Sequence, residues 1–292
     1  MVAFPNCKIN LGLNIIRKRS DGYHDLEAVF YPVPLTDALE IVRDDVSSFK
    51  LQDKSTTKPS TVDRRPLTVD FTSTGLPING AESDNLCVKA YQLLLRDFPD
   101  LPAIKMHLHK VIPMGAGLGG GSADGAFALQ LLNNKFQLQL TPEQLIIYAL
   151  ELGSDCPFFI INQPCFATNR GENMQPIHLD LSTYQLVLVN PQIHIGTGWA
   201  FSNITPQIPA ISIQTVIQQP VATWKDTLIN DFQKPAIQQY PAIGEAIAEL
   251  YQQGAVYSAM TGSGSTVFGL FTKDTKPQLS FPKNYFIHST LL

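Results

Sequence analysis

The segment GAGLGGGS at residues 115–122 holds five glycines in eight positions. Each glycine loses more backbone entropy on folding than any other residue, so this density indicates a chain that must take positive φ angles or approach another group closely. An alternating segment at 104–112 precedes it, and an apolar helical pattern at about 123–133 follows, with Ser122 as the predicted N-cap. The segment therefore predicts a strand, a tight loop and a helix whose N-terminus offers N–H groups to an anion.

Three interpretations of this loop compete. A strand-to-helix turn without a ligand does not explain so many glycines. Gly115, Gly117 and Gly120 match the GxGxxG pattern of dinucleotide folds, which carry an acid about 20 residues further on. The acid nearest to that position, Glu143, lies in the first turn of a predicted helix. A Walker-type loop requires Lys-Ser or Lys-Thr after the last glycine, and Ser122-Ala123 stands there instead.

The overall charge makes a local anion site necessary if the ligand is a polyphosphate. The formal net charge is −4, which argues against a nucleic acid or an anionic membrane as partner. No stretch reaches the roughly 20 apolar residues of a membrane span, and the four cysteines lack metal-site or redox spacing. The sequence predicts a cytoplasmic protein whose partner is neither a nucleic acid nor a membrane, and it leaves a monomer and a homodimer equally open.

The periodicity predicts an α+β protein of two lobes, residues 1–165 and 166–292. Residues 7–16 alternate as a strand with Lys8 and Asn10 on one face. Asp84 and Thr141 are predicted helix N-caps, the latter in a capping box with Gln144. Further strands are expected near 27–33, 38–42, 104–112, 185–189, 256–260 and 266–271, and helices near 85–98, 123–133, 142–152 and 240–253. Residues 44–66 are expected to form an exposed excursion.

The pattern Pro113-Met-Gly-Ala-Gly-Leu-Gly-Gly-Gly-Ser-Ala-Asp resembles the phosphate-binding loop of the galactokinase, homoserine kinase, mevalonate kinase and phosphomevalonate kinase (GHMP) superfamily. Ala123 and Gly125 replace residues that are Ser and Ala in most relatives. The resemblance implies an N-terminal lobe of the ribosomal-S5 type, a ferredoxin-like C-terminal lobe, and ATP as phosphoryl donor.

Other segments are similar to the diphosphocytidyl-methylerythritol kinases within that superfamily. They are Lys8-Ile-Asn-Leu, Asp21-Gly-Tyr-His, Ser83-Asp-Asn-Leu, Gly153-Ser-Asp-Cys-Pro-Phe-Phe and Thr261-Gly-Ser-Gly-Ser. The resemblance spans Lys8 to Phe271. It implies transfer of the γ-phosphoryl group of ATP to the 2-hydroxyl of 4-diphosphocytidyl-2-C-methyl-D-erythritol, a step of non-mevalonate isoprenoid synthesis.

The same resemblance implies roles for individual residues. Asp155 is expected to act as catalytic base beside Lys8, Tyr23 to stack on cytosine with Phe201 closing the stack, and His24 to hydrogen-bond the base. The residues expected to bind ATP are Pro113, Met114, Gly115, Ala116, Gly117, Leu118, Gly119, Gly120, Gly121, Ser122 and Asn85. Those expected to bind the substrate are Asn10, Tyr23, His24, Thr197, Phe201, Gly262, Ser263 and Gly264. Mg²⁺ is expected with ATP, with Ser122 as a conceivable ligand.

Structural alternatives exist for the same residues. Lys8 and Asp155 can form an ion pair without catalytic function, and Asp155 can cap the turn at Pro157. His24 can satisfy local backbone groups, and Phe201 can be a core aromatic. Cys156 has no histidine in its segment, so an inert thiol is expected. At the level of function, the alternatives are another small-alcohol kinase of the superfamily, a non-catalytic nucleotide-binding relative and, more distantly, an NAD-dependent enzyme.

Overall fold

The computed structural model describes residues 1–44 and 69–292. Most of the expected excursion at 44–66 therefore lies outside the described residues. The chain forms two compact units whose segments alternate along the sequence. Unit 1 comprises Met1–Pro5, Asp37–Val111 and Gly121–Ile160, and unit 2 comprises Asn6–Thr36, Ile112–Gly120 and Ile161–Leu292. The expected division into lobes at residue 165 stays a prediction.

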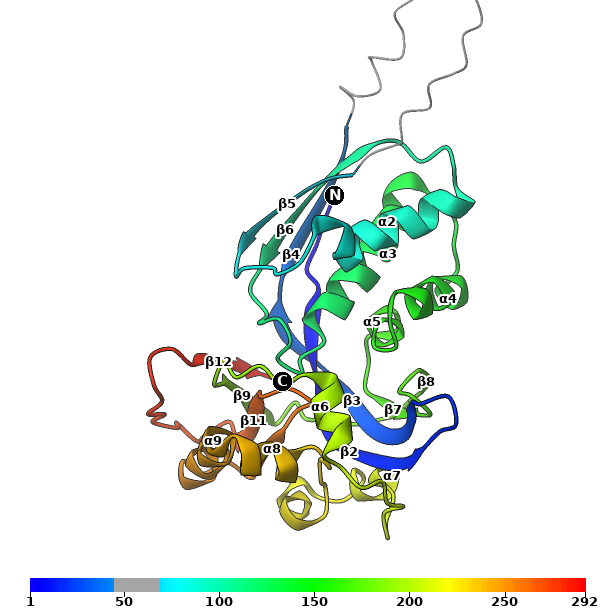
Figure 1. The fold of residues 1–292 in the computed structure, drawn as a ribbon. Helices are drawn as coiled ribbons and strands as arrows, with labels where there is room; N and C mark the ends of the chain where they lie inside the picture. Colours follow the sequence, from blue (N-terminus) through cyan, green and yellow to red (C-terminus); the bar gives the residue numbers. More distant parts are fainter. Residues whose placement is uncertain (45–68) are drawn as a thin grey trace, which may run out of the picture. The chain divides into compact units, whose positions relative to one another are not determined.

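Unit 1 is a four-stranded sheet with helices on one face (Figure 1). Its strand order is β1-β4-β6-β5, with β5 and β6 parallel and the other pairs antiparallel. The strands are β1 (Val2–Ala3), β4 (Ala38–Arg43), β5 (Val69–Gly75) and β6 (Ile104–Lys110). The helices are η1 (Glu82–Asp84), α2 (Leu86–Asp97), α3 (Gly120–Phe136), α4 (Pro142–Leu152) and α5 (Cys156–Ile161). The strands expected near 38–42 and 104–112 and the helices expected near 85–98, 123–133 and 142–152 are confirmed, whereas β1, β5, η1 and α5 were not predicted.

Two predicted helix starts in unit 1 are wrong, one by a single residue and the other by three residues. Asp84 ends the 3₁₀ turn η1, and Asn85 caps α2 instead, because its side-chain oxygen accepts from the Cys87 N–H at 2.9 Å. Helix α3 already begins at Gly120, so Ser122 lies inside it rather than at its N-cap. The Thr141 capping box is confirmed, with both reciprocal hydrogen bonds present and Pro142 at the first helical position.

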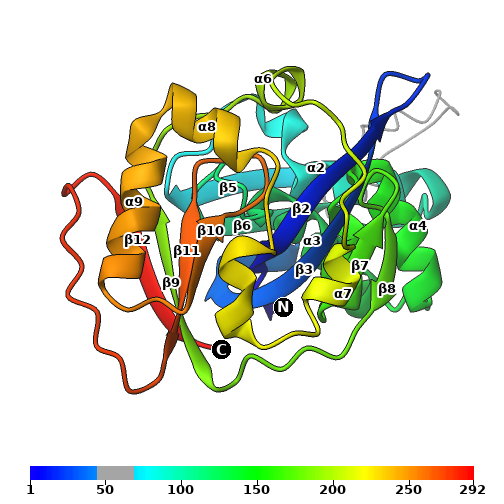
Figure 2. The ribbon, with the colours of Figure 1, turned by 90° about the horizontal axis from the view of Figure 1, so that it is seen from below.

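Unit 2 holds two antiparallel four-stranded sheets. The first, in the order β2-β3-β7-β8, consists of β2 (Asn6–Lys18), β3 (His24–Thr36), β7 (Cys165–Thr168) and β8 (Asn173–Pro176). The second, in the order β10-β11-β9-β12, consists of β9 (Tyr184–Asn190), β10 (Tyr257–Met260), β11 (Val267–Thr272) and β12 (Phe286–Leu291). Helix α9 (Pro241–Gln252) packs on β10 and β11 (Figure 2). The other helices of this unit are α6 (Thr197–Ser202), α7 (Ile213–Val216), η2 (Val221–Asp226) and α8 (Gln233–Gln239).

Strand β2 is the central element of unit 2. Residues 6–15 are all buried, so both faces of the strand are covered along its first ten residues. A register shift between Leu11 and Leu13 leaves Gly12 as a β-bulge with φ 75°, which interrupts the predicted alternation. The polar residues of this strand, Lys8 and Asn10 among them, are therefore held inside the unit and require internal partners.

Candidate active site

Lys8 and Asn10 lie on the same face of β2, as the alternation predicts. Their side chains are 4% and 2% exposed, and Lys8 Nζ donates to Asn10 Oδ1. Lys8 Nζ also lies 4.8 Å from the centre of the Phe30 ring on the neighbouring strand β3. A buried ammonium group surrounded by an amide oxygen and a ring face is a preformed positive centre in unit 2.

The glycine loop crosses the edge of this strand. The Lys8 N–H donates to the Leu118 carbonyl at 2.9 Å, and Ala116 and Leu118 are buried anchors while Met114 and Gly115 are exposed. Gly115, Gly117 and Gly119 all take positive φ angles, of 65°, 81° and 70°. The loop is therefore anchored at alternate residues with conformations that glycine adopts without strain.

A second glycine loop, Thr261–Ser265 between β10 and β11, packs directly against the first. A Cβ atom built on Gly264 would lie 2.4 Å from the Gly117 nitrogen, and one built on Gly117 would lie 2.3 Å from the Thr261 carbonyl oxygen. A side chain at either position would therefore prevent the backbones of the two loops from touching. The sequence predicted only that glycines in the first loop allow a ligand to approach closely.

The Thr261 hydroxyl joins three segments of unit 2. Its oxygen accepts from the Asn10 N–H at 2.8 Å and donates to the Gly117 carbonyl at 3.4 Å. Thr261 is fully buried, so these contacts fix strand β2 and both loops to one another. The sequence reasoning placed Thr261 in the loop but assigned it no role.

Two buried asparagines, missed by the sequence reasoning, hold the second loop. Asn230 donates through Nδ2 to the carbonyls of Met260 and Gly262 at 2.8 and 2.9 Å. Asn190, at the end of β9, donates to the hydroxyls of Ser265 and Thr266. Each asparagine also accepts from a backbone N–H two residues later, so its amide is almost fully used. Nothing in the sequence near either residue marks it for this function.

Asp155 lies in unit 1, in the turn between the end of α4 and the start of α5, and is half-buried. Cys156 beside it is buried, and burial raises the pKa of its thiol to about 12. That pKa agrees with the predicted inert thiol. Asn85, also in unit 1, uses its side-chain oxygen to cap α2.

The residues predicted to recognise the base lie in unit 2. The His24 ring stacks on Phe201 with centroids 4.8 Å apart and planes 24° apart, and Phe201 makes an edge contact with Phe232. Tyr23 is 57% exposed, and Thr197, the first residue of α6, is exposed as well. Burial lowers the pKa of His24 and the charge of Lys18 lowers it further, which favours the neutral imidazole near pH 7.

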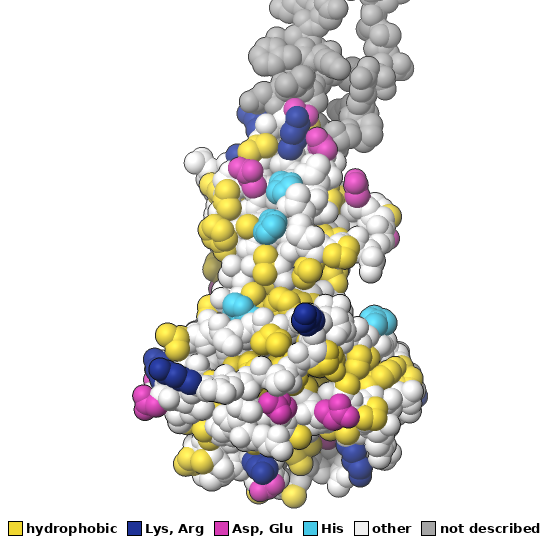
Figure 3. All heavy atoms as spheres, turned by 90° about the vertical axis from the view of Figure 1, so that its left-hand side faces the viewer, with side chains coloured by type: hydrophobic (Ala, Val, Ile, Leu, Met, Phe, Trp, Pro, Cys, Tyr) yellow, Lys and Arg dark blue, Asp and Glu magenta, His cyan; other side chains and the backbone are white. Residues whose placement is uncertain are grey.

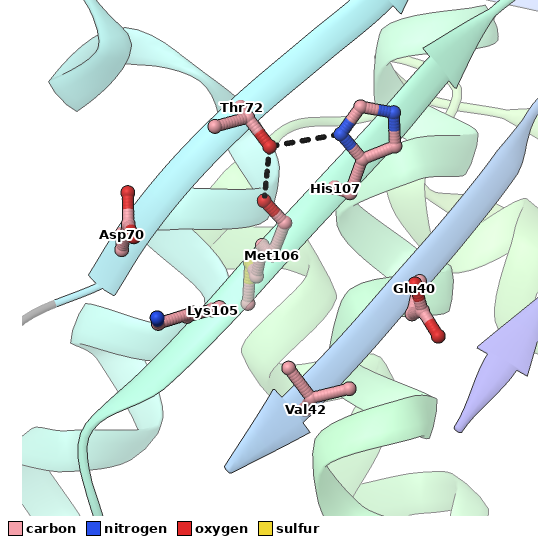
Figure 4. Close-up of a pocket in the computed structure, with 7 residues that line it drawn as sticks. All are labelled: Glu40, Val42, Asp70, Thr72, Lys105, Met106 and His107. Atoms are coloured by element: carbon pink, nitrogen blue, oxygen red, sulfur yellow. Dashed lines mark hydrogen bonds between the residues drawn. The ribbon is translucent and has the colours of Figure 1, made fainter. Parts of the chain in front are cut away.

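None of the predicted site residues lines the pocket on the open face of the unit 1 sheet. That pocket is formed by Glu40, Val42, Asp70, Thr72, Lys105, Met106 and His107 (Figure 4). Thr72 Oγ1 and His107 Nδ1 are 2.8 Å apart there. Figure 3 shows histidine, acidic and basic side chains on this side of the unit 1 sheet with apolar atoms between them. Because its acidic and basic groups are mixed, the pocket provides no concentrated charge for a polyphosphate.

The described residues, 1–44 and 69–292, contain no group of three or more His, Cys, Asp or Glu side chains arranged to hold a metal ion. No helix among them is long and apolar enough to cross a membrane.

Comparison with known proteins finds relatives along the whole chain. Residues 85–163 match the model of the GHMP kinases N terminal domain, and residues 222–280 match that of the GHMP kinases C terminal domain. The chain is 50% identical to proteins named 4-diphosphocytidyl-2-C-methyl-D-erythritol kinase from Bacteroides fragilis and Bacteroides thetaiotaomicron, over 94% and 98% of each chain.

Solved structures are similar as well. A crystal structure of 4-(cytidine 5'-diphospho)-2C-methyl-D-erythritol kinase is 26% identical with a TM-score of 0.75, over 92% of this chain and 90% of that one. The mevalonate kinase of Methanococcus jannaschii has a TM-score of 0.66 at 11% identity, over 99% and 97% of the two chains, and this likeness concerns the fold alone. The predicted α+β fold of the GHMP type is confirmed.

Proposed function

The chain belongs to the 4-diphosphocytidyl-2-C-methyl-D-erythritol kinase family of GHMP kinases, and from this membership we propose that it phosphorylates the 2-hydroxyl of that cytidine substrate with ATP. The reaction is a step of non-mevalonate isoprenoid synthesis. The observation that carries the proposal is the arrangement around β2. Its buried Lys8 and Asn10 are hydrogen-bonded to the two glycine loops, and the hairpin it forms with β3 bears Tyr23 and His24.

The glycine loop and the start of α3 are the proposed site of the ATP phosphates. Exposed Gly115 and Met114 border backbone held at positive φ, where successive N–H groups can converge on phosphate oxygens. The first N–H groups of α3 lack helical partners and add the positive end of the helix dipole. Asn85 Oδ1 is engaged in capping, so its Nδ2 is the atom we propose to contact adenine.

The acceptor is proposed to be bound through its cytidine and its sugar-alcohol parts. Tyr23 and Phe201 provide ring faces for cytosine, and neutral His24 provides both a donor and an acceptor for the base edge. Because Phe201 now stacks directly on His24 at 4.8 Å, we propose that the base enters beside this pair, with one of the rings turning to admit it. Asn10, Thr197 and the loop Gly262–Gly264 complete the proposed substrate contacts.

Asp155 is proposed to accept the proton of the 2-hydroxyl as that oxygen attacks the γ-phosphorus. The bond between the γ-phosphorus and the β–γ bridging oxygen breaks, and ADP leaves with the electron pair. The Lys8 ammonium is proposed to stabilise the negative charge that develops on the acceptor oxygen. Positioning by the loops supplies the remainder of the catalysis, as in other phosphoryl transfers.

Mg²⁺ is proposed to accompany ATP and to neutralise charge on the phosphate oxygens. The described residues hold no group of three or more His, Cys, Asp or Glu side chains for it, so its ligands are proposed to be phosphate oxygens and water, with the Ser122 hydroxyl as the protein ligand. We also propose that the enzyme acts in the cytoplasm, as a monomer or homodimer.

The test is ADP release with Mg²⁺-ATP and the cytidine substrate, beside homoserine and mevalonate. We expect turnover of the cytidine compound alone. Asp155→Asn should lower kcat by about 10²- to 10⁴-fold, the usual contribution of general-base catalysis. Asp100→Asn, at an exposed aspartate of the same unit, is the matched control and should leave kcat unchanged. Turnover of homoserine or mevalonate would retain a kinase but remove the role given to Tyr23 and His24. ATP binding without turnover of any alcohol would indicate a non-catalytic relative.

A further inference from the structure

Tyr23 is an exposed ring held from one side by a cation. The guanidinium carbon of Arg170, in the β7–β8 turn, lies 5.0 Å from the centre of the Tyr23 ring, although 57% of Tyr23 remains exposed. An exposed tyrosine on a loop ordinarily samples several rotamers, and an arginine stacked on one face restricts it. The contact therefore orients a ring that is more than half exposed.

Arg170 is itself fixed. Its backbone N–H donates to Glu172 Oε2 at 2.7 Å, and its Nε lies 3.4 Å from Glu172 Oε1. The turn that carries it is tied to β3, because the Leu26 N–H donates to the Asn169 carbonyl at 2.6 Å. Asn169 and Gly171 take positive φ angles of 61° and 104°, which closes the turn tightly.

The backbone of Tyr23 is fixed independently. The Tyr23 N–H donates to Asp21 Oδ1 at 3.0 Å, and Arg19 pairs with both Asp21 and Asp25. The hydrogen bond from Tyr23 and the pairing with Arg19 lower the pKa of Asp21, so its carboxylate stays charged at neutral pH. Backbone and ring are thus anchored by two separate sets of contacts before any ligand binds.

We propose that Arg170 is a positioning residue for cytidine recognition, holding the Tyr23 ring as a preorganised platform on which the base stacks. The inference rests on the proposed function. A platform already in place lowers the ordering cost of binding, so the effect belongs to substrate affinity and not to the chemical step. The guanidinium covers one ring face and the base takes the other, which gives a stack of cation, phenol and cytosine.

The test compares Arg170→Met, which keeps the aliphatic stem, with wild type. We expect Arg170→Met to raise KM for the cytidine substrate about two- to five-fold, the usual effect of an exposed cation–π contact, without changing kcat or KM for ATP. Affinity for cytidine 5'-diphosphate, measured by calorimetry, should fall by the same factor. Arg96→Met, at an exposed arginine that pairs with Asp97 and Glu151 in unit 1, is the matched control and should change none of these quantities.

A double-mutant cycle separates positioning from direct contact. In a Tyr23→Leu background, Arg170→Met should have no further effect, because the platform is already gone. An equal effect in both backgrounds would show that Arg170 contacts the substrate itself and would overturn the inference. If the wild type phosphorylates the cytidine compound and Arg170→Met has an unchanged KM for it, the inference is wrong and the proposed function stands. A wild type that neither phosphorylates the cytidine compound nor binds cytidine 5'-diphosphate would overturn the inference together with the proposed function.

Discussion

At the scale of single residues, the Thr261 hydroxyl has the clearest energetic role. It satisfies the buried Asn10 N–H and reaches the Gly117 carbonyl, so one side chain connects a strand to two loops. Thr261→Val keeps the volume and removes both hydrogen bonds. Because a buried N–H is left unsatisfied, we expect a loss of about 1–3 kcal/mol in the free energy of unfolding.

Thr261→Ser is the control for that prediction, since it retains the hydroxyl and loses only a methyl group. Urea unfolding followed by tryptophan fluorescence suits the measurement, because Trp199 and Trp224 both lie in unit 2. Equal losses in the two variants would mean that the methyl packing, and not the hydrogen bonding, stabilises the loops.

His24 provides a pH prediction at the same scale. Burial places its folded-state pKa below the ordinary value, so between that pKa and about 6.5 the unfolded chain binds more protons than the folded one. The contribution of His24 to the free energy of unfolding is therefore fully present above about pH 6.5 and falls as pH decreases through the folded-state pKa. Burial also lowers the pKa of His288, so the wild-type curve contains both contributions.

The difference between wild type and His24→Gln isolates the contribution of His24. That difference should shrink as pH falls from 7 to 5, and KM for the cytidine substrate should rise over the same range as the stacked imidazole becomes charged. A wild-type minus variant difference that is constant with pH would contradict the prediction.

Sequence reasoning succeeded for residues whose partners are local. Lys8 and Asn10 are two positions apart on a strand, so alternation alone brought them together. Asn230 could not be found in this way, because its hydrogen-bond acceptors are backbone carbonyls 30 and 32 residues further along the chain. A backbone acceptor has no side chain to mark it in the sequence.

At the scale of elements, the contact between the two glycine loops is the least tolerant of change. A Cβ on residue 264 would lie 2.4 Å from the Ala116 carbon as well as from the Gly117 nitrogen, and neither backbone atom can rotate away. Gly264→Ala should therefore separate the loops, with a cost of at least about 1–3 kcal/mol in stability. ATP affinity should fall at the same time, because the phosphate loop loses its support.

Gly198→Ala, in the short helix α6, is the control for this effect. A Cβ there would meet nothing within 4 Å, and replacement of glycine by alanine inside a helix favours folding by up to about 1 kcal/mol. Thermal unfolding and equilibrium ATP binding of the two variants provide the comparison. If Gly264→Ala keeps wild-type stability and ATP affinity, the contact between the loops supports neither folding nor ATP binding.

The start of a helix was predictable from the sequence where two neighbouring residues form reciprocal hydrogen bonds. The Thr141–Gln144 capping box specifies its helix start from two local hydrogen bonds, and the structure has both. At α2 and α3 the predicted cap residue stood two positions from the first helical residue. Asp84 and Asn85 have nearly equal cap preference, but Asp84 is the last residue of the 3₁₀ turn η1, so Asn85 caps α2.

At the scale of the whole molecule, the distribution of segments between units was beyond the sequence. Residues 6–36 group with 161–292 by their contacts, although they are far from them along the chain. Hydrophobic periodicity identifies strands but not the strands with which they pair. The resemblance to known kinases supplied the fold that periodicity could not.

The strongest whole-molecule prediction concerns a buried charge cluster in unit 1. The Lys110 side chain is fully buried, and its Nζ donates to Asp37 Oδ2 at 2.5 Å and to Asp124 Oδ2 at 2.7 Å. Asp124 Oδ1 has no hydrogen-bond partner among the described residues. Two carboxylates share one ammonium group, so burial, opposed by Lys110 but reinforced by Asp37, raises the pKa of Asp124 to about 7.

This shift has a definite sign. In the unfolded chain an aspartate titrates near 3.9, so between about pH 4 and pH 7 the folded state binds more protons than the unfolded state. The stability contributed by Asp124 is fully present below about pH 4 and is lost as pH rises through about 7. The Asp124 contribution to the free energy of unfolding falls with rising pH, whereas the His24 contribution rises. The stabilities of the two units should therefore change with pH in opposite directions.

Asp124→Asn should remove this pH dependence of the stability of unit 1, because the amide stays neutral at every pH and can still accept a hydrogen bond from Lys110. Amide hydrogen exchange in β6 and α3 measures unit 1 separately from the tryptophans of unit 2. From pH 5 to pH 8 the wild-type free energy of opening should fall relative to that of Asp124→Asn. Lys110→Met should instead destabilise unit 1 at every pH, and more strongly at high pH, since it leaves two buried carboxyl groups without a cation. A parallel pH dependence in wild type and Asp124→Asn would mean that Asp124 is ionised throughout and that Lys110 alone compensates both carboxylates.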